Sequence, residues 1–166
     1  DWWNANHNPH TVLSLSVAAD AYGLSRGAFG TIEMGHEPRK AYDNQVGNLV
    51  AENAWYNNLR AVAKANEAII ISNRTQNGQE LAAAHFLRGI AWGYLGLIFD
   101  QVILTDTTTS KEVVFTDYSK AIDRSIEELE LAIELAEITP NFQHSYFNDV
   151  LLNQQSFIAL AHAYAA

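Results

Sequence analysis

Two residues that could bind a metal ion lie three positions apart in the sequence, at Glu33 and His36. The Glu-x-x-His spacing is that of carboxylate-bridged di-iron bundles, which need two such motifs on helices and two further glutamates. This chain has one such motif, and it lies among loop glycines. The sequence therefore predicts no metal site and no cofactor.

The sequence also has no motif that is typical of an enzyme with a nucleophilic side chain. The chain has no cysteine, which excludes thiol nucleophiles and zinc sites built on Cys ligands. Serine, histidine and aspartate occur, but no Gly-x-Ser-x-Gly turn presents a serine. No Gly-Lys-Ser/Thr follows the glycines of residues 23–35, so a phosphate-binding loop is not expected. The sequence predicts a protein that is not an enzyme.

The composition is that of a globular protein. Of 166 residues, 48% are hydrophobic and 17% charged, which suffices for one domain with a full core. The formal net charge of -9 argues against binding a nucleic-acid backbone. We expect a single helical domain over residues 1–166. Because the chain opens without a signal-like segment and stops at Ala166 in mid-pattern, we also expect it to be a fragment of a longer protein.

Hydrophobic periodicity and capping residues predict five helices, at residues 9–22, 45–72, 78–99, 116–138 and 153–166. A short extended piece is expected at 102–104, and no strand of consequence elsewhere, so the predicted fold class is all-α. Residues 23–44 have no sustained period and contain several glycines. A loop of that length is often functional.

The helix at 78–99 is apolar on almost every face, which is typical of a central helix covered on several sides. Gly89, Gly93 and Gly96 form a strip without side chains, where another helix is expected to approach closely. Asn77 is expected to cap this helix, with Glu80 three residues later.

The neighbouring helices are predicted to be amphipathic. Asn53 and Asn66 lie in the apolar stripe of helix 45–72, and we expect their amides to bond neighbouring backbone or loop groups. The other members of that stripe are Val46, Leu49, Val50, Tyr56, Leu59, Ala63 and Ile70. Thr116 is expected to cap helix 116–138, whose inner stripe is Tyr118, Ile122, Ile126, Leu129, Ile133 and Ala136. Its outer, solvated face carries Asp123, Glu127, Glu130, Glu134 and Glu137. The inner side of helix 153–166 is expected to be Phe157, Leu160, Ala161 and Tyr164.

Helix 116–138 resembles the second helix of a tetratricopeptide (TPR) repeat, with Ala121 and Ala132 as the small residues that let paired helices nest. The order of motifs along the chain is similar to that of the SusD/RagB family of outer-membrane glycan-binding lipoproteins. Five blocks carry this resemblance, at residues 55–70, 80–95, 99–104, 118–132 and 156–164.

Each block is similar to one motif of that family. Residues 55–70 resemble its W-x-x-x-Y/L … A-N-x-x-I helix, and residues 80–95 its E-A-x-x-L-R-A-x-x-Y-x-x-L helix. Residues 99–104 are similar to its F-G-D-V-P-L exit. Residues 118–132 resemble its Y-x-x-I-x-x-D-L-x-x-A helix, and residues 156–164 its A-x-x-L-A-R-x-Y helix.

The resemblance implies a fold of TPR-like antiparallel helical hairpins forming an α-α superhelix, as in the N-terminal part of SusD-like proteins. It implies non-catalytic capture of an oligosaccharide at the outer membrane, with a lipid anchor that this chain lacks. The implied partner is a SusC-like TonB-dependent transporter that takes up the nutrient. The alternative is a helical-repeat adaptor that binds a peptide or protein in its concave groove without any sugar.

The predicted ligand site is the loop at residues 23–44, because the corresponding N-terminal region of that family contributes to the ligand face. Flat aromatic rings can stack on sugar rings, and amide, carboxylate and guanidinium groups can bond hydroxyls. Phe29 and Tyr42 are the candidate stacking rings. The candidate hydrogen-bonding residues are Asp20, Arg26, Arg39, Asp43 and Asn44.

Overall fold

The structure is a computed structural model, and it describes residue 16 and residues 49–104, 114–147 and 150–166. The chain divides into two compact units, residues 1–58 and 59–166, which are described separately. In the first unit the described part is Ser16 and the beginning of helix α4 (Leu49–Thr75). There Asn58 is fully buried, and its Nδ2 donates a hydrogen bond to the Ala54 carbonyl oxygen over 2.8 Å. The helix predicted at 9–22 and the loop at 23–44 lie outside the described residues apart from Ser16.

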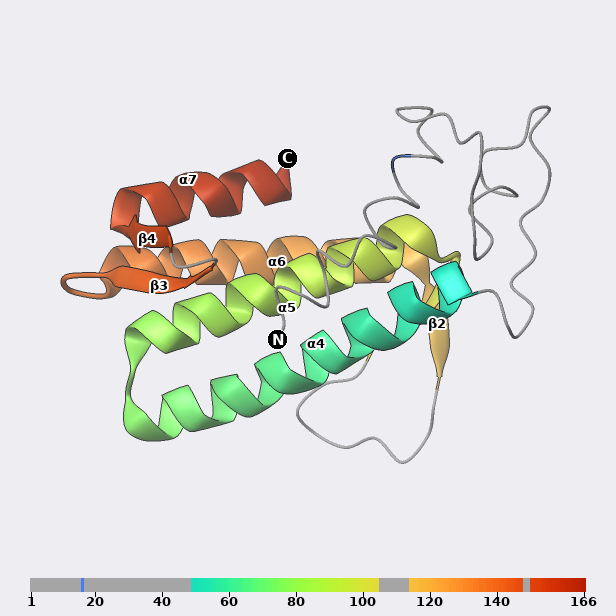
Figure 1. Cartoon of the computed structure of the whole chain (residues 1–166), viewed down its shortest axis with the longest axis horizontal. Coiled ribbons are helices and arrows are strands. Elements are labelled where there is room, and N and C mark those ends of the chain that lie inside the picture. The colour runs from blue at the N-terminus through green and yellow to red at the C-terminus, as the bar shows by residue number, and fades with distance from the viewer. Residues whose placement is uncertain (1–15, 17–48, 105–113, 148–149) are drawn as a thin grey trace. The chain divides into compact units, whose positions relative to one another are not determined.

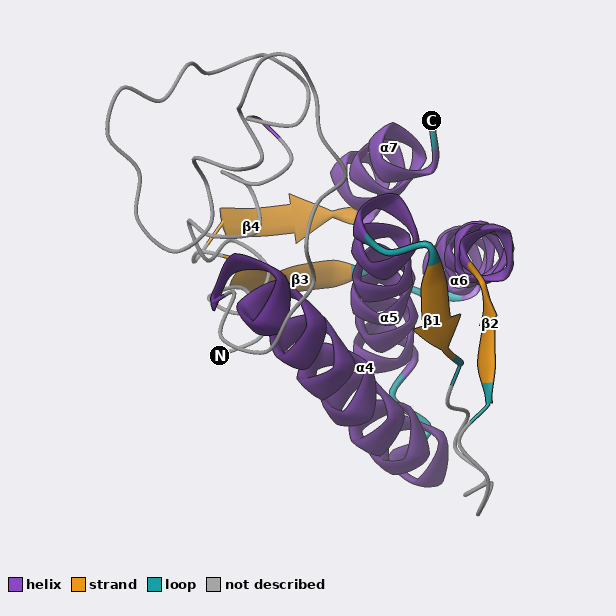
Figure 2. Ribbon diagram, turned by 90° about the vertical axis from the view of Figure 1, so that its right-hand side faces the viewer, coloured by secondary structure: helices purple, strands orange, loops and turns teal. Residues whose placement is uncertain are grey.

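The second unit consists mostly of helices (Figures 1 and 2). It contains the rest of α4, then α5 (Gly78–Ile98), α6 (Tyr118–Ile138) and α7 (Gln154–Ala165). The predicted helices at 45–72, 78–99, 116–138 and 153–166 are confirmed within a few residues at each end, and so is the mainly α class.

Side chains at the helix starts explain these boundaries. The Asn77 side chain accepts a hydrogen bond from the Glu80 backbone N–H, as predicted, and Asn153 does the same for Ser156. The prediction that Thr116 caps α6 is wrong. Asp117 accepts from the Ser119 backbone N–H instead, while the Thr116 hydroxyl donates to the Val102 carbonyl oxygen.

Two short antiparallel ladders accompany the helices. Strand β1 (Gln101–Ile103) pairs with β2 (Phe115–Asp117), which confirms the extended piece expected near 102–104. Strand β3 (Gln143–Phe147) pairs with β4 (Val150–Asn153). The expectation of no further strand is wrong here. These segments are too short for a visible alternating pattern, and the β3 segment is anchored by tertiary burial of Phe142 and His144.

Helix α5 is the most buried described helix, as its composition predicts (Figure 2). Its glycine strip faces α6: a Cβ on Gly89 would lie 2.9 Å from Leu129 Cγ, and one on Gly96 would lie 2.7 Å from Ile122 Cδ1. Successive glycines of α5 thus meet successively earlier residues of α6. The two helices are therefore antiparallel and in close contact, which confirms the predicted role of Gly89, Gly93 and Gly96.

The predicted inner faces are partly wrong. In α4 the buried residues are rotated away from the expected stripe, and Tyr56 and Ile70 are exposed. The buried residues of this helix are Ala54, Asn58, Ala61, Val62, Ala65, Ile69 and Ser72. In α6 the inner-stripe residues Tyr118 and Ile126 are exposed, whereas Ala121, Ser125 and Glu128 are buried. Most of these buried positions hold small residues, because small side chains let two helices approach closely. A pattern of large apolar residues does not reveal such positions.

An aromatic cluster fills the space between α5 and α7. The Phe86 ring centroid lies 5.3 Å from that of Phe157 and 5.6 Å from that of Tyr164, the latter edge-on. The ring centroids of Phe142 and Phe157 lie 4.8 Å apart. Phe157 and Ala161 are buried as predicted, and Tyr164 is at the border of exposure. This cluster joins α7 and the β3 segment to the central helix.

Among the described residues, α5 is the one helix whose length and apolar composition would allow it to cross a membrane. However, 67% of its most apolar window is buried inside the protein, and the core helix of a folded domain meets the same criteria. It also carries the buried charged side chain of Arg88.

We expect Gly93→Leu to destabilise the protein by about 1 to 3 kcal/mol through overpacking. A Cβ at Gly93 would already lie 2.9 Å from Ser125 Oγ, so a leucine must displace the Ser125 side chain, which donates to the Gly89 carbonyl oxygen, or move α6 itself. Urea unfolding measures the change. The matched control is Ala63→Leu on the exposed side of α4, which should change stability by at most about 0.5 kcal/mol. Equal stability of the two variants would contradict the close contact.

Candidate functional site

The seven residues predicted to bind a ligand all lie outside the described part of the chain. They are Asp20, Arg26, Phe29, Arg39, Tyr42, Asp43 and Asn44. Glu33 and His36, whose single motif predicts no metal site, lie outside it too. The ligand-binding role of this loop therefore stays a prediction.

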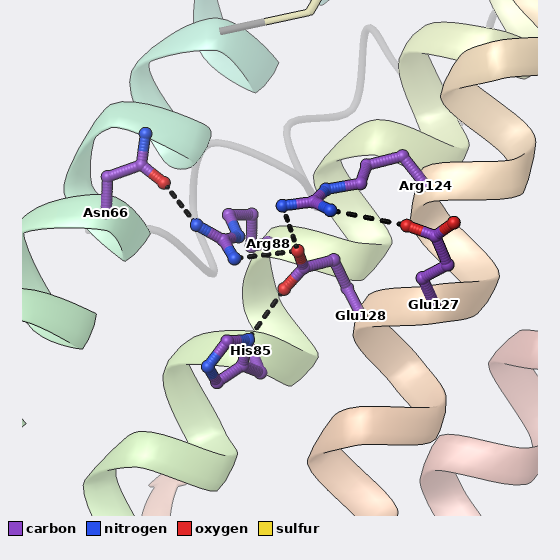
Figure 3. A network of polar contacts seen from close by, with 6 residues as sticks. All are labelled: Asn66, His85, Arg88, Arg124, Glu127 and Glu128. Carbon is purple, nitrogen blue, oxygen red and sulfur yellow. Dashed lines mark hydrogen bonds and ion pairs between the residues drawn. The ribbon is translucent and has the colours of Figure 1, made fainter. Parts of the chain in front are cut away.

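Within the second unit, the most concentrated polar chemistry is a network centred on the Glu128 carboxylate of α6 (Figure 3). Its Oε1 accepts a hydrogen bond from Arg88 Nη2 over 2.7 Å and lies 3.0 Å from Arg124 Nη2. Its Oε2 lies 2.7 Å from His85 Nδ1. Arg88 Nη1 donates to Asn66 Oδ1, also over 2.7 Å, which brings α4 into the network.

Helical spacing places these side chains together. His85 and Arg88 are three residues apart and so lie on one face of α5, while Arg124 and Glu128 are four apart on α6. The glycine strip holds the two helices close, and Ser125 Oγ donates to the Gly89 carbonyl oxygen over 2.7 Å in the same contact. At the border of the network, Arg124 Nη1 also pairs with Glu127, whose side chain is mostly exposed.

The charge state of Glu128 follows from these contacts. Burial would raise the pKa of its carboxyl, but hydrogen bonds from His85 and Arg88, together with their charges, lower the pKa below its ordinary value. Glu128 is therefore a carboxylate at neutral pH. Because a carboxylate only accepts hydrogen bonds, His85 Nδ1 must carry the hydrogen that it shares with Glu128.

This arrangement fits a structural role better than catalysis or metal binding. Both carboxylate oxygens already face cationic or N–H donors, and the Glu128 side chain is 3% exposed. No group of three or more metal-binding side chains occurs in the described ranges. The network fastens α4, α5 and α6 to one another.

Sequence reasoning did not predict the contacts of this network. Asn66 was expected to bond backbone or loop groups, and that is wrong because its partner is the side chain of Arg88. Asn53 is half-buried in the first unit, and its expected bonding stays a prediction. Glu128 was missed altogether. Its signal is positional: it lies on the same face of α6 as Ala121, Ser125 and Ala132, all of which are buried.

His144 on β3 is a second buried ionisable residue. It is 4% exposed, and burial lowers the pKa of its imidazole to about 4. The ring is therefore neutral in the folded protein over the whole physiological range.

The chain has no match among protein-family models, curated proteins or solved structures.

We expect Glu128→Gln to lower the free energy of unfolding by about 3 kcal/mol or more, because it leaves buried cationic groups without their counter-charge. The matched control is Glu127→Gln, which removes the neighbouring exposed carboxylate and should cost at most about 0.5 kcal/mol. Urea titration at pH 7 compares the two. Similar losses in both variants would show that burial of Glu128 has no energetic consequence.

The low pKa of His144 predicts a loss of stability in mild acid. Between the ordinary histidine pKa of 6.5 and about 4 the unfolded chain binds a proton that the folded chain does not. Stability is therefore complete above pH 6.5 and falls as the pH decreases towards 4, by up to about 3 kcal/mol. Glu128, whose pKa is also lowered, contributes a further loss at the acid end of this range, below its ordinary value of 4.5.

His144→Gln should remove the first of these losses. The difference in unfolding free energy between parent and variant, measured by urea unfolding from pH 7 to pH 4, should shrink as the pH falls. His162→Gln replaces an exposed histidine and should leave that dependence as in the parent. If the difference in unfolding free energy between parent and His144→Gln stays constant from pH 7 to pH 4, His144 is not the source of the loss of stability in acid.

Proposed function

We propose that this chain is the TPR-like helical part of a SusD-like protein that captures oligosaccharides at the outer membrane without catalysis. In this proposal the protein is held at the cell surface by a lipid anchor. It passes its ligand to a SusC-like TonB-dependent transporter for nutrient uptake. No cofactor takes part.

The observation that best supports the proposal is the meeting of three motif residues in one network. Asn66 belongs to the block that resembles A-N-x-x-I, and Arg88 is the arginine of the block that resembles L-R-A. In the block at 118–132, Glu128, Leu129 and Ala132 have the spacing of the D-L-x-x-A part of the motif alone, with glutamate in place of aspartate. Residues distant in sequence thus share hydrogen bonds, which gives a physical reason for these motifs to occur together in one chain.

The helix contacts are also compatible with a TPR-like arrangement. Helices α5 and α6 are antiparallel, and Ala121 and Ala132, the small residues of the TPR resemblance, are both fully buried. In the proposal these helices are the scaffold, and the loop at 23–44 supplies the ligand face.

Screening the purified protein on an array of oligosaccharides of diverse composition tests this function. We expect one class of glycan to bind, and Tyr42→Ala to weaken binding of that glycan by about 1 to 3 kcal/mol, by analogy with base–aromatic stacking. That corresponds to a roughly five- to 150-fold higher dissociation constant in calorimetry. Tyr118→Ala, at an exposed tyrosine on α6, is the matched control and should bind as the parent does.

The outcome also separates glycan capture from the helical adaptor. Binding of a glycan together with co-purification of a TonB-dependent transporter is the result expected for glycan capture. Failure to bind any glycan, with capture of peptides instead, would favour the adaptor. Glycan binding that Tyr42→Ala leaves unchanged would remove the loop at 23–44 from the site.

A further inference from the structure

The exposed side of α4 carries a regular stripe of mainly basic residues, which we call the α4 stripe. Its members follow one another at intervals of four, three, four and three residues, so they lie along one line of the helix. They are Arg60, Lys64, Glu67, Ile71 and Arg74. All five are exposed, Ile71 to 58% and the Lys64 side chain to 72%. The stripe thus contains three cations, one carboxylate and a bare isoleucine.

The outer side of α6 carries a stripe with the same spacing, which we call the α6 stripe. Its intervals are again four, three, four and three residues, and every member is acidic and exposed. The members are Asp123, Glu127, Glu130, Glu134 and Glu137. Exposed apolar residues flank it, Ile126 on one side and Leu131 and Ile138 on the other.

The two stripes face away from each other. Helix α5 lies between the Leu59–Thr75 part of α4 and α6 (Figures 1 and 2), and Arg88 of α5 reaches both neighbours. The buried side of α4, with Ala61, Ala65 and Ile69, is opposite its stripe. One molecule therefore cannot pair its own stripes, whereas two molecules can.

We propose that this chain self-associates head to tail, with the α4 stripe of one copy seated on the α6 stripe of the next. Equal spacing gives five facing levels along about 21 Å of helix, and at three of them a cation of the α4 stripe faces a carboxylate of the α6 stripe. Charge complementarity identifies the occupant, because the acidic stripe meets a basic one on an otherwise acidic protein of net charge -9. Ile70 and Ile71 of one copy contact the apolar flanks of the α6 stripe in the other.

Such an interface joins two different surfaces, so it is heterologous. A heterologous contact propagates into a ring or a filament and does not stop at a two-fold dimer. The chain therefore forms species larger than a dimer as its concentration rises.

Salt separates this contact from general effects of charge. If only the net charge acted, added salt would screen the repulsion between copies and increase association. Paired stripes give the opposite dependence, because salt screens their attraction. We expect the weight-average mass in sedimentation equilibrium to rise with protein concentration at 20 mM NaCl and to approach the monomer mass at 500 mM NaCl.

Charge reversal tests the pairing directly. The double variant Arg60→Glu/Lys64→Glu and the double variant Glu130→Lys/Glu134→Lys should each lower the association constant at least about tenfold at low salt. An equimolar mixture of the two should associate again, because the unaltered α4 stripe of the Glu130→Lys/Glu134→Lys variant meets the unaltered α6 stripe of the other variant. None of these four side chains belongs to the Glu128 network, and thermal unfolding verifies that both variants fold.

Glu67 is the one residue of the α4 stripe with the wrong charge for this contact. Glu67→Lys should therefore strengthen association at least about tenfold. Asp100→Lys makes the same charge change at an exposed site outside both stripes, and it should not have that effect.

A chain that is monomeric at every salt concentration overturns the proposal, as does association that increases with salt. Variants that lose association separately but do not regain it in the mixture would also overturn it.

Discussion

The buried carboxylate of Glu128 is the constraint on which the second unit depends. Removing a carboxylate from water costs several kcal/mol unless nearby donors and opposite charges compensate it. Here the compensation comes from His85 and Arg88 on α5 and from Arg124 on α6 itself, and Arg88 is in turn held by Asn66 on α4. A slip of α5 along α6 by one turn would separate these groups by about 5 Å. The network therefore fixes the register of the helices as well as their contact.

The glycine strip and the network need each other. Without side chains at Gly89, Gly93 and Gly96, α6 approaches α5 until Leu129, Ser125 and Ile122 touch the strip. Close approach excludes water, and in the resulting low-dielectric interior each hydrogen bond to Glu128 is stronger. The glycine strip alone would let α5 slide along α6, because glycines have no side chains that interlock with the facing helix. Glu128 and Ser125 supply the specific contacts that a smooth surface lacks.

The sequence was sufficient for the helices but not for their faces. Periodicity together with Asn77, Gly78 and Pro140 placed the ends of α5 and α6 nearly correctly. Apolar periodicity does not predict the inner faces, because small and charged residues occupy part of them: Ala65 and Glu128 are buried, while Tyr56 is exposed. The place of Glu128 on the face of Ala121 and Ala132 is a local signal, but its burial also depends on Arg88 and His85 of another helix. The hairpin of β3 and β4 depends likewise on tertiary contacts that no local pattern encodes.

The distribution of charge follows from the same arrangement. Glu128 holds the Arg88 side chain in the interior and also pairs with Arg124, whose side chain is 35% exposed. In the described helices of the second unit, exposed carboxylates gather on the outer side of α6, and exposed cations gather mainly on the α4 stripe. Because α5 holds α4 and α6 on opposite sides, this segregation gives the helical layer a basic and an acidic edge. The interior network thus joins the two helices on which the exposed charges are segregated.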